Sequence, residues 1–451
     1  MTRLLKKLNF YFLRFRLKQS PQKTLFYGFL TYILVGFILL SLPWLQKVDT
    51  SFLDNLFIAT SAVSTTGLVT ISVFDSYNFA GQFVVMVLFQ LGGIGYLTFT
   101  TFMILSTTRK ITRWHKKILS SEFTLPKTIE IKDFLKSVVL FTFFMELIGA
   151  ILFFIAFKLD GMNSSTAIWS SIFHSISAFC TAGFSLFNSG FTSYVDNGFI
   201  NFIISFLAIA GSLGFIVVTD FVYWAKDRKH TLSFTTKIVL FGFLILLSFG
   251  FLFFYFTEPS ITLLEGKSRI YGAFFQAMTA MTTVGFNTVD FGVFALPMLL
   301  VTIFLMYIGA SPSGTAGGMK ITTLTAVISI MKSRIRGDKR ITFLGRTIPF
   351  ERLYIATSSF IFYTSLIGLG TFLLTFTEDF DLRQLLFEAS SALGTVGLSM
   401  GITGDLSSLG KIIIIILMFI GRLGVLTFGL AIWSKDIDQE EPTVLEGDIA
   451  V

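Results

Sequence analysis

Four short stretches of this chain carry backbone suited to holding an ion. In each, a threonine stands two residues before a glycine and a bulky apolar residue follows: Thr65-Thr66-Gly67-Leu68, Thr181-Ala182-Gly183-Phe184, Thr283-Val284-Gly285-Phe286 and Thr395-Val396-Gly397-Leu398. Glycine permits backbone angles that other residues avoid, so successive carbonyl oxygens can point to one axis. The carbonyl oxygens of four such loops would replace the hydration shell of a dehydrated cation. No metal site is expected elsewhere in the chain. The sequence therefore predicts a cation filter made of backbone oxygens.

The match between the four stretches continues upstream. A phenylalanine lies ten residues before each glycine, and an alanine preceded by Ser or Thr lies five before it: Phe57, Phe173, Phe275 and Phe387, then Ala62, Ala178, Ala280 and Ala392. Copies in register indicate internal repeats. A duplicated helix-packing glycine is the alternative, but it does not explain the threonine at fixed spacing.

Short apolar runs must position these loops. They cover residues 52–63, 166–179, 269–281 and 382–393, about half of the roughly 20 residues that span a bilayer. We expect half-helices that enter the membrane and stop. Each would point its C-terminal end, with its negative partial charge, at the filter.

Long apolar runs flank each half-helix. They cover residues 25–42, 79–105, 137–157, 199–224, 237–256, 296–331, 354–376 and 411–433 of a chain that is 53% hydrophobic and 14% charged. The predicted fold is an all-α membrane protein. It has four tandem repeats of helix, pore helix, filter loop and helix, with pseudo-fourfold symmetry around one pore and eight spanning helices.

Basic residues predict the orientation. The net charge of +8 could suggest a nucleic-acid partner, but the basic residues gather in blocks between apolar segments. This bias places the termini, 1–24 and 434–451, and the loops 109–136, 226–236 and 332–353 in the cytosol. The repeats then occupy residues 25–108, 137–225, 237–331 and 354–433. The loops 109–117 and 332–340 could bind anionic lipid or a cytosolic partner.

The last helix of the third repeat is interrupted. The segment holds a proline and four glycines, which oppose a continuous helix: Gly309, Ala310, Ser311, Pro312, Ser313, Gly314, Thr315, Ala316, Gly317, Gly318, Met319 and Lys320. We expect a movable gate just inside the filter; a static kink is the alternative.

Charged residues inside apolar segments are expensive and therefore candidates for function. Arg422 is expected to form a fixed positive barrier below the filter and to contact the gate loop. Lys320 could pair with Asp220, Glu388 could help to hold the filter, and Glu146 could be a buried hydrogen-bonding group. Three scattered histidines and one cysteine build no metal or nucleophile cluster, and His174 is expected to pack rather than bind metal.

With these motifs, the chain resembles the Trk/Ktr/HKT superfamily of potassium transporters, most closely the KtrB-type membrane subunit. The resemblance covers nearly the whole chain. It implies potassium uptake across the cell membrane, a homodimer and a cytosolic ring of nucleotide-binding regulatory subunits. In that family glycine in all four loops goes with potassium, and serine in the first goes with sodium preference in some plant members. Sodium-coupled potassium symport remains open, whereas a membrane enzyme or ATP-driven pump has no supporting motif.

Overall fold

The computed structural model describes residues 20–95, 131–227, 231–309 and 311–433, and within them the chain is almost entirely helical. Each of four blocks opens with a long helix and continues with a shorter one. The long helices are α2 (Pro21–Leu40), α8 (Ile131–Leu159), α12 (Phe234–Thr257) and α17 (Phe350–Thr377). The shorter ones are α3 (Phe52–Val63), α9 (Ser164–Phe179), α14 (Gly266–Thr282) and α18 (Leu382–Gly394).

The shorter helices form the centre of the protein. Each packs against the long helix before it, α2 with α3, α8 with α9, α12 with α14 and α17 with α18. Their repeated phenylalanines and alanines are fully buried: Phe57, Phe173, Phe275, Phe387, Ala62, Ala178, Ala280 and Ala392. The half-helices expected from the sequence are thus present, with bounds that differ by a few residues.

The helices after the Gly loops are more broken than expected. They are α5 (Phe79–Ile94), α10 (Gly198–Ser212), α11 (Phe215–Lys226), α15 (Leu296–Tyr307), α16 (Ile321–Arg336), α19 (Ser408–Leu423) and α20 (Val425–Trp433). The expectation of continuous helices over 199–224 and 411–433 was wrong. The chain bends by 89° between α10 and α11 and by 98° between α19 and α20. Gly214 and Gly424 stand at these bends with φ of +86°, which ends a right-handed helix.

Four helices of the described chain, at 21–40, 134–159, 234–257 and 350–377, are long and apolar enough to cross a membrane. The number rises to six if each bent pair is one span. The eight spans of the sequence prediction are therefore not reached by length and composition. One expected span, 79–105, continues beyond α5 into residues outside the described chain.

Short turns complete the described chain. They are the helices α4 (Val73–Ser76) and α13 (Pro259–Thr262) and the 3-10 turns η1 (Pro43–Leu45), η2 (Thr192–Tyr194), η3 (Phe291–Val293) and η4 (Thr403–Asp405). Two small strand pairs lie among the helices. β1 (Ile308–Gly309) pairs in parallel with β2 (Met319–Lys320), and β3 (Thr342–Phe343) forms a hairpin with β4 (Arg346–Thr347).

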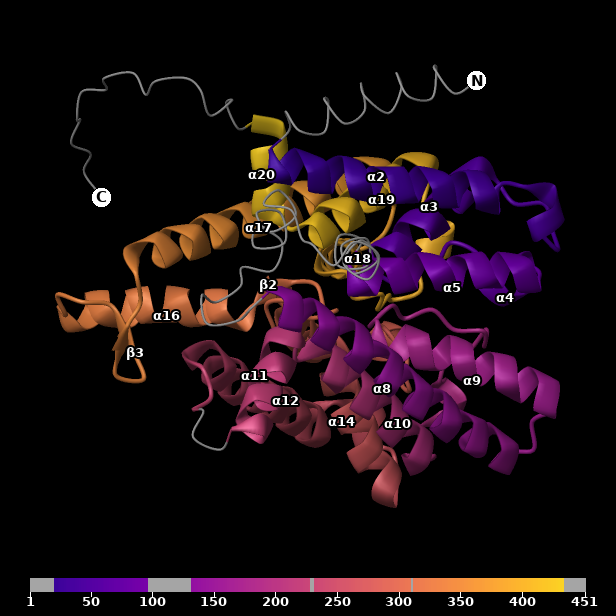
Figure 1. Ribbon diagram of the computed structural model, residues 1–451. Coiled ribbons are helices and arrows are strands. Elements are labelled where there is room, and N and C mark those ends of the chain that lie inside the picture. The colour runs from indigo at the N-terminus through magenta and orange to yellow at the C-terminus, as the bar shows by residue number, and fades with distance from the viewer. Residues whose placement is uncertain (1–19, 96–130, 228–230, 310, 434–451) are drawn as a thin grey trace, which may run out of the picture.

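The first and last blocks meet in space. α2 packs on α20 and α3 packs on α19, which places the indigo and yellow ends of the described chain together (Figure 1). Next to α20, α17 packs against α16, and β3 lies beside α16 (Figure 1). The chain thus closes on itself around the half-helices.

Candidate ion filter and gate loop

Each half-helix ends in the same backbone turn. Thr65, Thr181, Thr283 and Thr395 all have positive φ, between +48° and +55°. The N–H of the residue after each threonine returns to a carbonyl on the helix, at Ser61, Ser177, Thr279 and Ser391. This is the Schellman ending, in which glycine usually takes the left-handed position. Threonine is β-branched and is strained in this conformation. The same unfavourable residue nevertheless takes the same conformation in all four loops.

A hydroxyl six residues before each glycine braces the loop. Ser61 and Ser391 accept hydrogen bonds from the N–H groups of Gly67 and Gly397, each at 3.1 Å. Ser177 and Thr279 instead donate to the carbonyls of Phe184 and Phe286, at 2.8 and 2.6 Å. The sequence showed these residues as the Ser or Thr before each repeated alanine, but their role was missed.

The four glycines face one another in chain order. A Cβ added to Gly67 would lie 2.9 Å from the Cα of Gly183, and one on Gly183 would lie 3.3 Å from Gly285. One on Gly285 would lie 3.2 Å from Gly397, and one on Gly397 would lie 3.1 Å from Gly67. Side chains at these positions would therefore collide with the backbone of the next loop. All four have positive φ, and the residues beside them, Thr66, Ala182, Val284, Val396, Leu68, Phe184, Phe286 and Leu398, are buried.

The interrupted helix forms a loop between β1 and β2. Ser313, with φ of +62°, accepts from the N–H of Phe215 on its carbonyl and from the N–H of Ile216 on its hydroxyl. The N–H of Thr315 donates to the carbonyl of Gly211 at 3.1 Å. The loop is thus docked where α10 ends and α11 begins. Ala310 lies outside the described residues.

The same loop touches the ends of the half-helices. The N–H of Gly317 donates to the hydroxyl of Thr283 at 3.0 Å, and the Thr315 hydroxyl donates to the carbonyl of Phe179 at 3.2 Å. Gly317 also lies against the backbone of Gly394. The loop therefore packs against the ends of α9, α14 and α18.

Arg422, at the end of α19, joins the first filter loop to the gate loop. Its guanidinium donates to the hydroxyl of Thr65 at 3.0 Å and to the carbonyl of Thr315 at 2.8 Å. It also donates to the carbonyls of Gly92 and Gly93 at the end of α5. The expected contact with the loop is present. The link to Thr65 had no signal in the sequence.

The expected pairing of Lys320 with Asp220 is wrong. The Lys320 ammonium donates to carbonyls of its own loop, Ala316 at 2.6 Å and Gly317 at 2.9 Å. The Asp220 carboxylate accepts from the N–H of Ser233 at 2.7 Å. Lys320 thus stabilises the folded loop by satisfying buried carbonyls, which an ion pair with α11 would leave unpaired.

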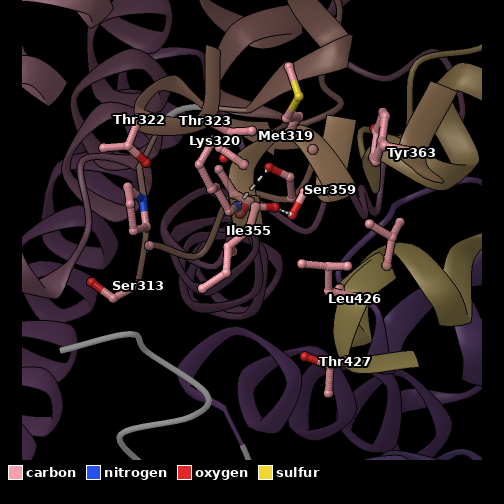
Figure 2. Close-up of a pocket in the computed structure, with 18 of the residues that line it drawn as sticks. Ser313, Met319, Lys320, Thr322, Thr323, Ile355, Ser359, Tyr363, Leu426 and Thr427 are labelled. Atoms are coloured by element: carbon pink, nitrogen blue, oxygen red, sulfur yellow. Dashed lines mark hydrogen bonds between the residues drawn. The ribbon is translucent and has the colours of Figure 1, made fainter. Parts of the chain in front are cut away.

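A cavity of about 620 Å³ lies beyond the loop, lined by loop residues and by α16, α17 and α20 (Figure 2). Figure 2 places Ser313 and Lys320 on the loop side, with Ser359 and Tyr363 of α17 and Thr427 of α20 around the space. Its charged lining residues in the described chain are Lys320, Arg352 and Arg422, and all are cationic. None of the four loop glycines, Gly67, Gly183, Gly285 and Gly397, lines this cavity.

Three buried polar residues lie behind the filter loops. Glu146 accepts from the amide of Gln90 at 3.0 Å and lies 3.9 Å from the Cys180 sulfur. His174 bonds the backbone on both ring nitrogens, and Glu388 accepts from Ser399 and Thr403. Within the described residues, no three His, Cys, Asp or Glu side chains gather to hold a metal ion.

These features define the class of protein. Long apolar helices surround half-helices that stop midway in strained loops, and irregular backbone at membrane depth is tolerated only where it is buried or lines a water-filled path. The chain is an integral membrane protein.

Comparison with known proteins then gives the family. The TrkH model, described as "Cation transport protein", matches residues 30–439, and the chain belongs to this family. Ktr system potassium uptake protein B of Bacillus subtilis (strain 168) is 35% identical over 414 residues, which cover 91% of this chain and 92% of that protein. Potassium/sodium uptake protein NtpJ of Enterococcus hirae is 35% identical over 431 residues, covering 94% and 95%.

A solved structure agrees in fold. The crystal structure of the potassium transporter TrkH from Vibrio parahaemolyticus superposes with a TM-score of 0.71 at 21% identity, covering 90% of this chain and 85% of that one. The helical arrangement is therefore that of a TrkH-type membrane protein.

Proposed function

We propose that this chain takes up potassium ions across the cell membrane through a selectivity filter formed by its four Gly loops. The observation that carries the proposal is the ring of Gly67, Gly183, Gly285 and Gly397, each against the next. Backbone oxygens around such a ring replace water around a cation. Four half-helix C-termini directed at the ring add negative partial charge, which favours cations.

Potassium is the preferred ion for two reasons. Relatives that match over nine-tenths of their length are named potassium uptake proteins. All four filter positions are glycine, which goes with potassium in the Trk/Ktr/HKT superfamily. Sodium coupling is the second candidate, because one equally similar relative is named a potassium/sodium uptake protein.

Tracer flux separates these two candidates. Purified protein in lipid vesicles should take up labelled potassium when the membrane potential alone is imposed, since 100 mV supplies about 2.3 kcal/mol per charge. Uptake should not change when sodium is replaced by choline. Uptake only with a sodium gradient would favour symport, and absence of cation uptake would refute the proposal.

The loop from Gly309 to Lys320 is the proposed gate. The loop lies between the glycine ring and a cavity whose charged walls are cationic, an arrangement that opposes the passage of potassium. Deleting Pro312–Gly314 removes the contacts with Phe215 and Ile216 and should raise potassium flux in vesicles. Unchanged flux in the deletion variant would favour a static kink.

The proposal includes the assembly around the pore. Four repeats with pseudo-fourfold symmetry are supported by the four matching turns, and cytosolic termini by the basic loops. Eight spans remain part of the proposal. The family resemblance adds a homodimer and a ring of nucleotide-binding regulatory subunits. Light scattering of the purified protein tests the dimer, with a monomeric mass as the contradicting result.

A further inference from the structure

One helix position repeats in sequence but differs in chemistry. The residues nine before each filter glycine are Ile58, His174, Gln276 and Glu388, and all four are fully buried. They lie on the half-helices about two turns before the Schellman endings. A position that only filled the core would be expected to be apolar in all four repeats, whereas here three of the four residues are polar.

The polar residues in the second and third repeats hold the segment that leaves the filter. The N–H of Leu186 donates to Nε2 of His174 at 3.2 Å, which fixes the ring proton on Nδ1, where it bonds the Ser170 carbonyl. Gln276 accepts from the N–H of Thr288 at 3.3 Å and donates to the carbonyl of Val289 at 2.7 Å. In both repeats the side chain contacts residues two to four positions past the glycine.

In the fourth repeat this position is a carboxylate bound by hydroxyls. Glu388 accepts on one oxygen from Ser399 at 3.0 Å and on the other from Thr403. The hydroxyl oxygens of Ser399 and Thr403 lie 2.9 Å apart, and the N–H of Gly401 donates to the Ser399 hydroxyl at 3.0 Å. The carboxylate thus organises the whole turn from Ser399 to Thr403.

This turn is directly connected to the filter. Ser399 is two residues after Gly397, so a shift of the turn would move the Val396 and Gly397 carbonyls. The helical side of the loop is already fixed by the Val396 N–H bond to Ser391 and by the Gly397 N–H bond to the Ser391 hydroxyl. Glu388 supplies the corresponding restraint on the outgoing side.

Resting on the proposed filter, we propose that Glu388 is a positioning residue for cation selection, which holds the fourth filter loop at the spacing that fits potassium. A purely structural role would lower the amount of folded protein and the total flux. It would leave the ratio of potassium to sodium flux unchanged, because each folded molecule would still carry an intact filter.

The test uses Glu388→Gln and Thr403→Val in full-length protein reconstituted in vesicles, with tracer potassium and sodium measured separately. Gln removes one of the two acceptor oxygens, and Val removes a donor at nearly constant shape. Each should lower the potassium-to-sodium flux ratio about tenfold, equal to about 1.4 kcal/mol, the order of one hydrogen bond. The two effects should not be fully additive in the double variant, since both weaken the same hydrogen-bonded cluster.

The matched control is Glu378→Gln. Glu378 also accepts from a serine, Ser407, at 2.5 and 3.0 Å, but it does so at the end of α17, away from the filter. The potassium-to-sodium flux ratio of the Glu378→Gln variant should stay at the wild-type value. Unchanged ratios in both Glu388→Gln and Thr403→Val, with or without loss of flux, would overturn the inference. Wild-type protein that carries no cation would refute the filter itself, which is a different failure.

Discussion

Backbone strain is concentrated at the filter. Four of the non-glycine residues with positive φ in the described chain are the filter threonines. Residues held in this region cost about 1–3 kcal/mol each and persist where the surroundings determine them fully. Here the surroundings are the helix ends and the Ser or Thr hydroxyls. These contacts therefore hold the carbonyls of the proposed filter in place in the folded protein.

Gly67→Ser should weaken potassium selection. The position has φ of +91°, and a Cβ there would meet the Ala182 carbonyl and the Cα of Gly183 at 2.9 Å. The first loop must shift, at a cost of about 1–3 kcal/mol, and the ring then fits potassium less well. The potassium-to-sodium flux ratio in vesicles should fall by about tenfold or more.

Gly161→Ser is the control for backbone strain alone. Gly161 has φ of +83° but nothing within 4 Å of its added Cβ. The variant should fold less stably while keeping the wild-type ratio. An equal fall of the flux ratio in Gly67→Ser and Gly161→Ser would show that ion selection does not depend on contact between the loops.

Arg422 variants should separate a charge barrier from a mechanical latch. Arg422→Ala removes both the charge and the bonds to Thr65 and Thr315, so potassium flux should rise severalfold. Arg422→Lys keeps the charge but not the planar fork of donors. Low flux in the Lys variant indicates a barrier, and flux like that of the Ala variant indicates a latch. Wild-type flux in the Ala variant would contradict both roles.

At the scale of elements, the sequence predicted the half-helices closely. The expected run 52–63 is α3 itself, and 382–393 differs from α18 by one residue. Apolar spacing and length suffice for this. The bends at Gly214 and Gly424 were missed, because a helical apolar pattern continues across them and gives no sign that one residue takes positive φ.

The gate loop was predicted as a break, but its contacts were not. Pro312 and the neighbouring glycines show in the sequence that a helix must end. The bond from Gly317 to Thr283 depends on tertiary packing between distant segments. The bond from Lys320 to its own loop depends on how the loop folds, which the residue types alone do not give. The same holds for the left-handed threonines, since β-branched residues normally avoid that conformation.

An ion pair joins the last block of the chain to the first. Lys411 on α19 lies 2.8 Å from Asp54 in the first turn of α3, although 357 residues separate them. Burial raises the pKa of the Asp54 carboxyl, but hydrogen bonds from Lys411 and Ser51 outweigh it, so the pKa lies below its ordinary value of 3.8. The pair thus favours the folded chain when Asp54 is ionised.

Asp54→Asn should therefore destabilise the protein in a pH-dependent way. Because the folded pKa is depressed, the contribution is complete above the unfolded pKa and is lost as pH falls through the folded one. Thermal unfolding in detergent should show a loss of about 1 kcal/mol at pH 7, which shrinks as the pH falls below 3.8 and disappears once the pH is below the folded pKa. The exposed Asp49→Asn serves as control. If the variant remained less stable than the wild type in acid, the ion pair would not be the cause of the destabilisation.

The whole molecule has a direction that follows from its charges. The basic loops would lie in the cytosol, and the half-helices would enter from outside with their C-terminal ends at the membrane midplane. A negative cell interior then draws cations from the outer mouth toward the gate. Along the proposed path the order is filter, gate loop and basic cavity, so the orientation of the protein would determine whether the gate opposes entry or exit.

The single cysteine makes this orientation measurable. Cys180 is fully buried, so the wild-type protein should not react with a membrane-impermeant maleimide. Val48, between α2 and α3, is 62% exposed, and Leu344, in the β3–β4 hairpin, is 58% exposed. Val48→Cys should label in intact cells, whereas Leu344→Cys should label only after permeabilisation. The reverse labelling pattern would show that the protein has the opposite orientation, with the gate on the outer side of the filter. Labelling of both variants from one side would contradict the membrane placement of the four repeats.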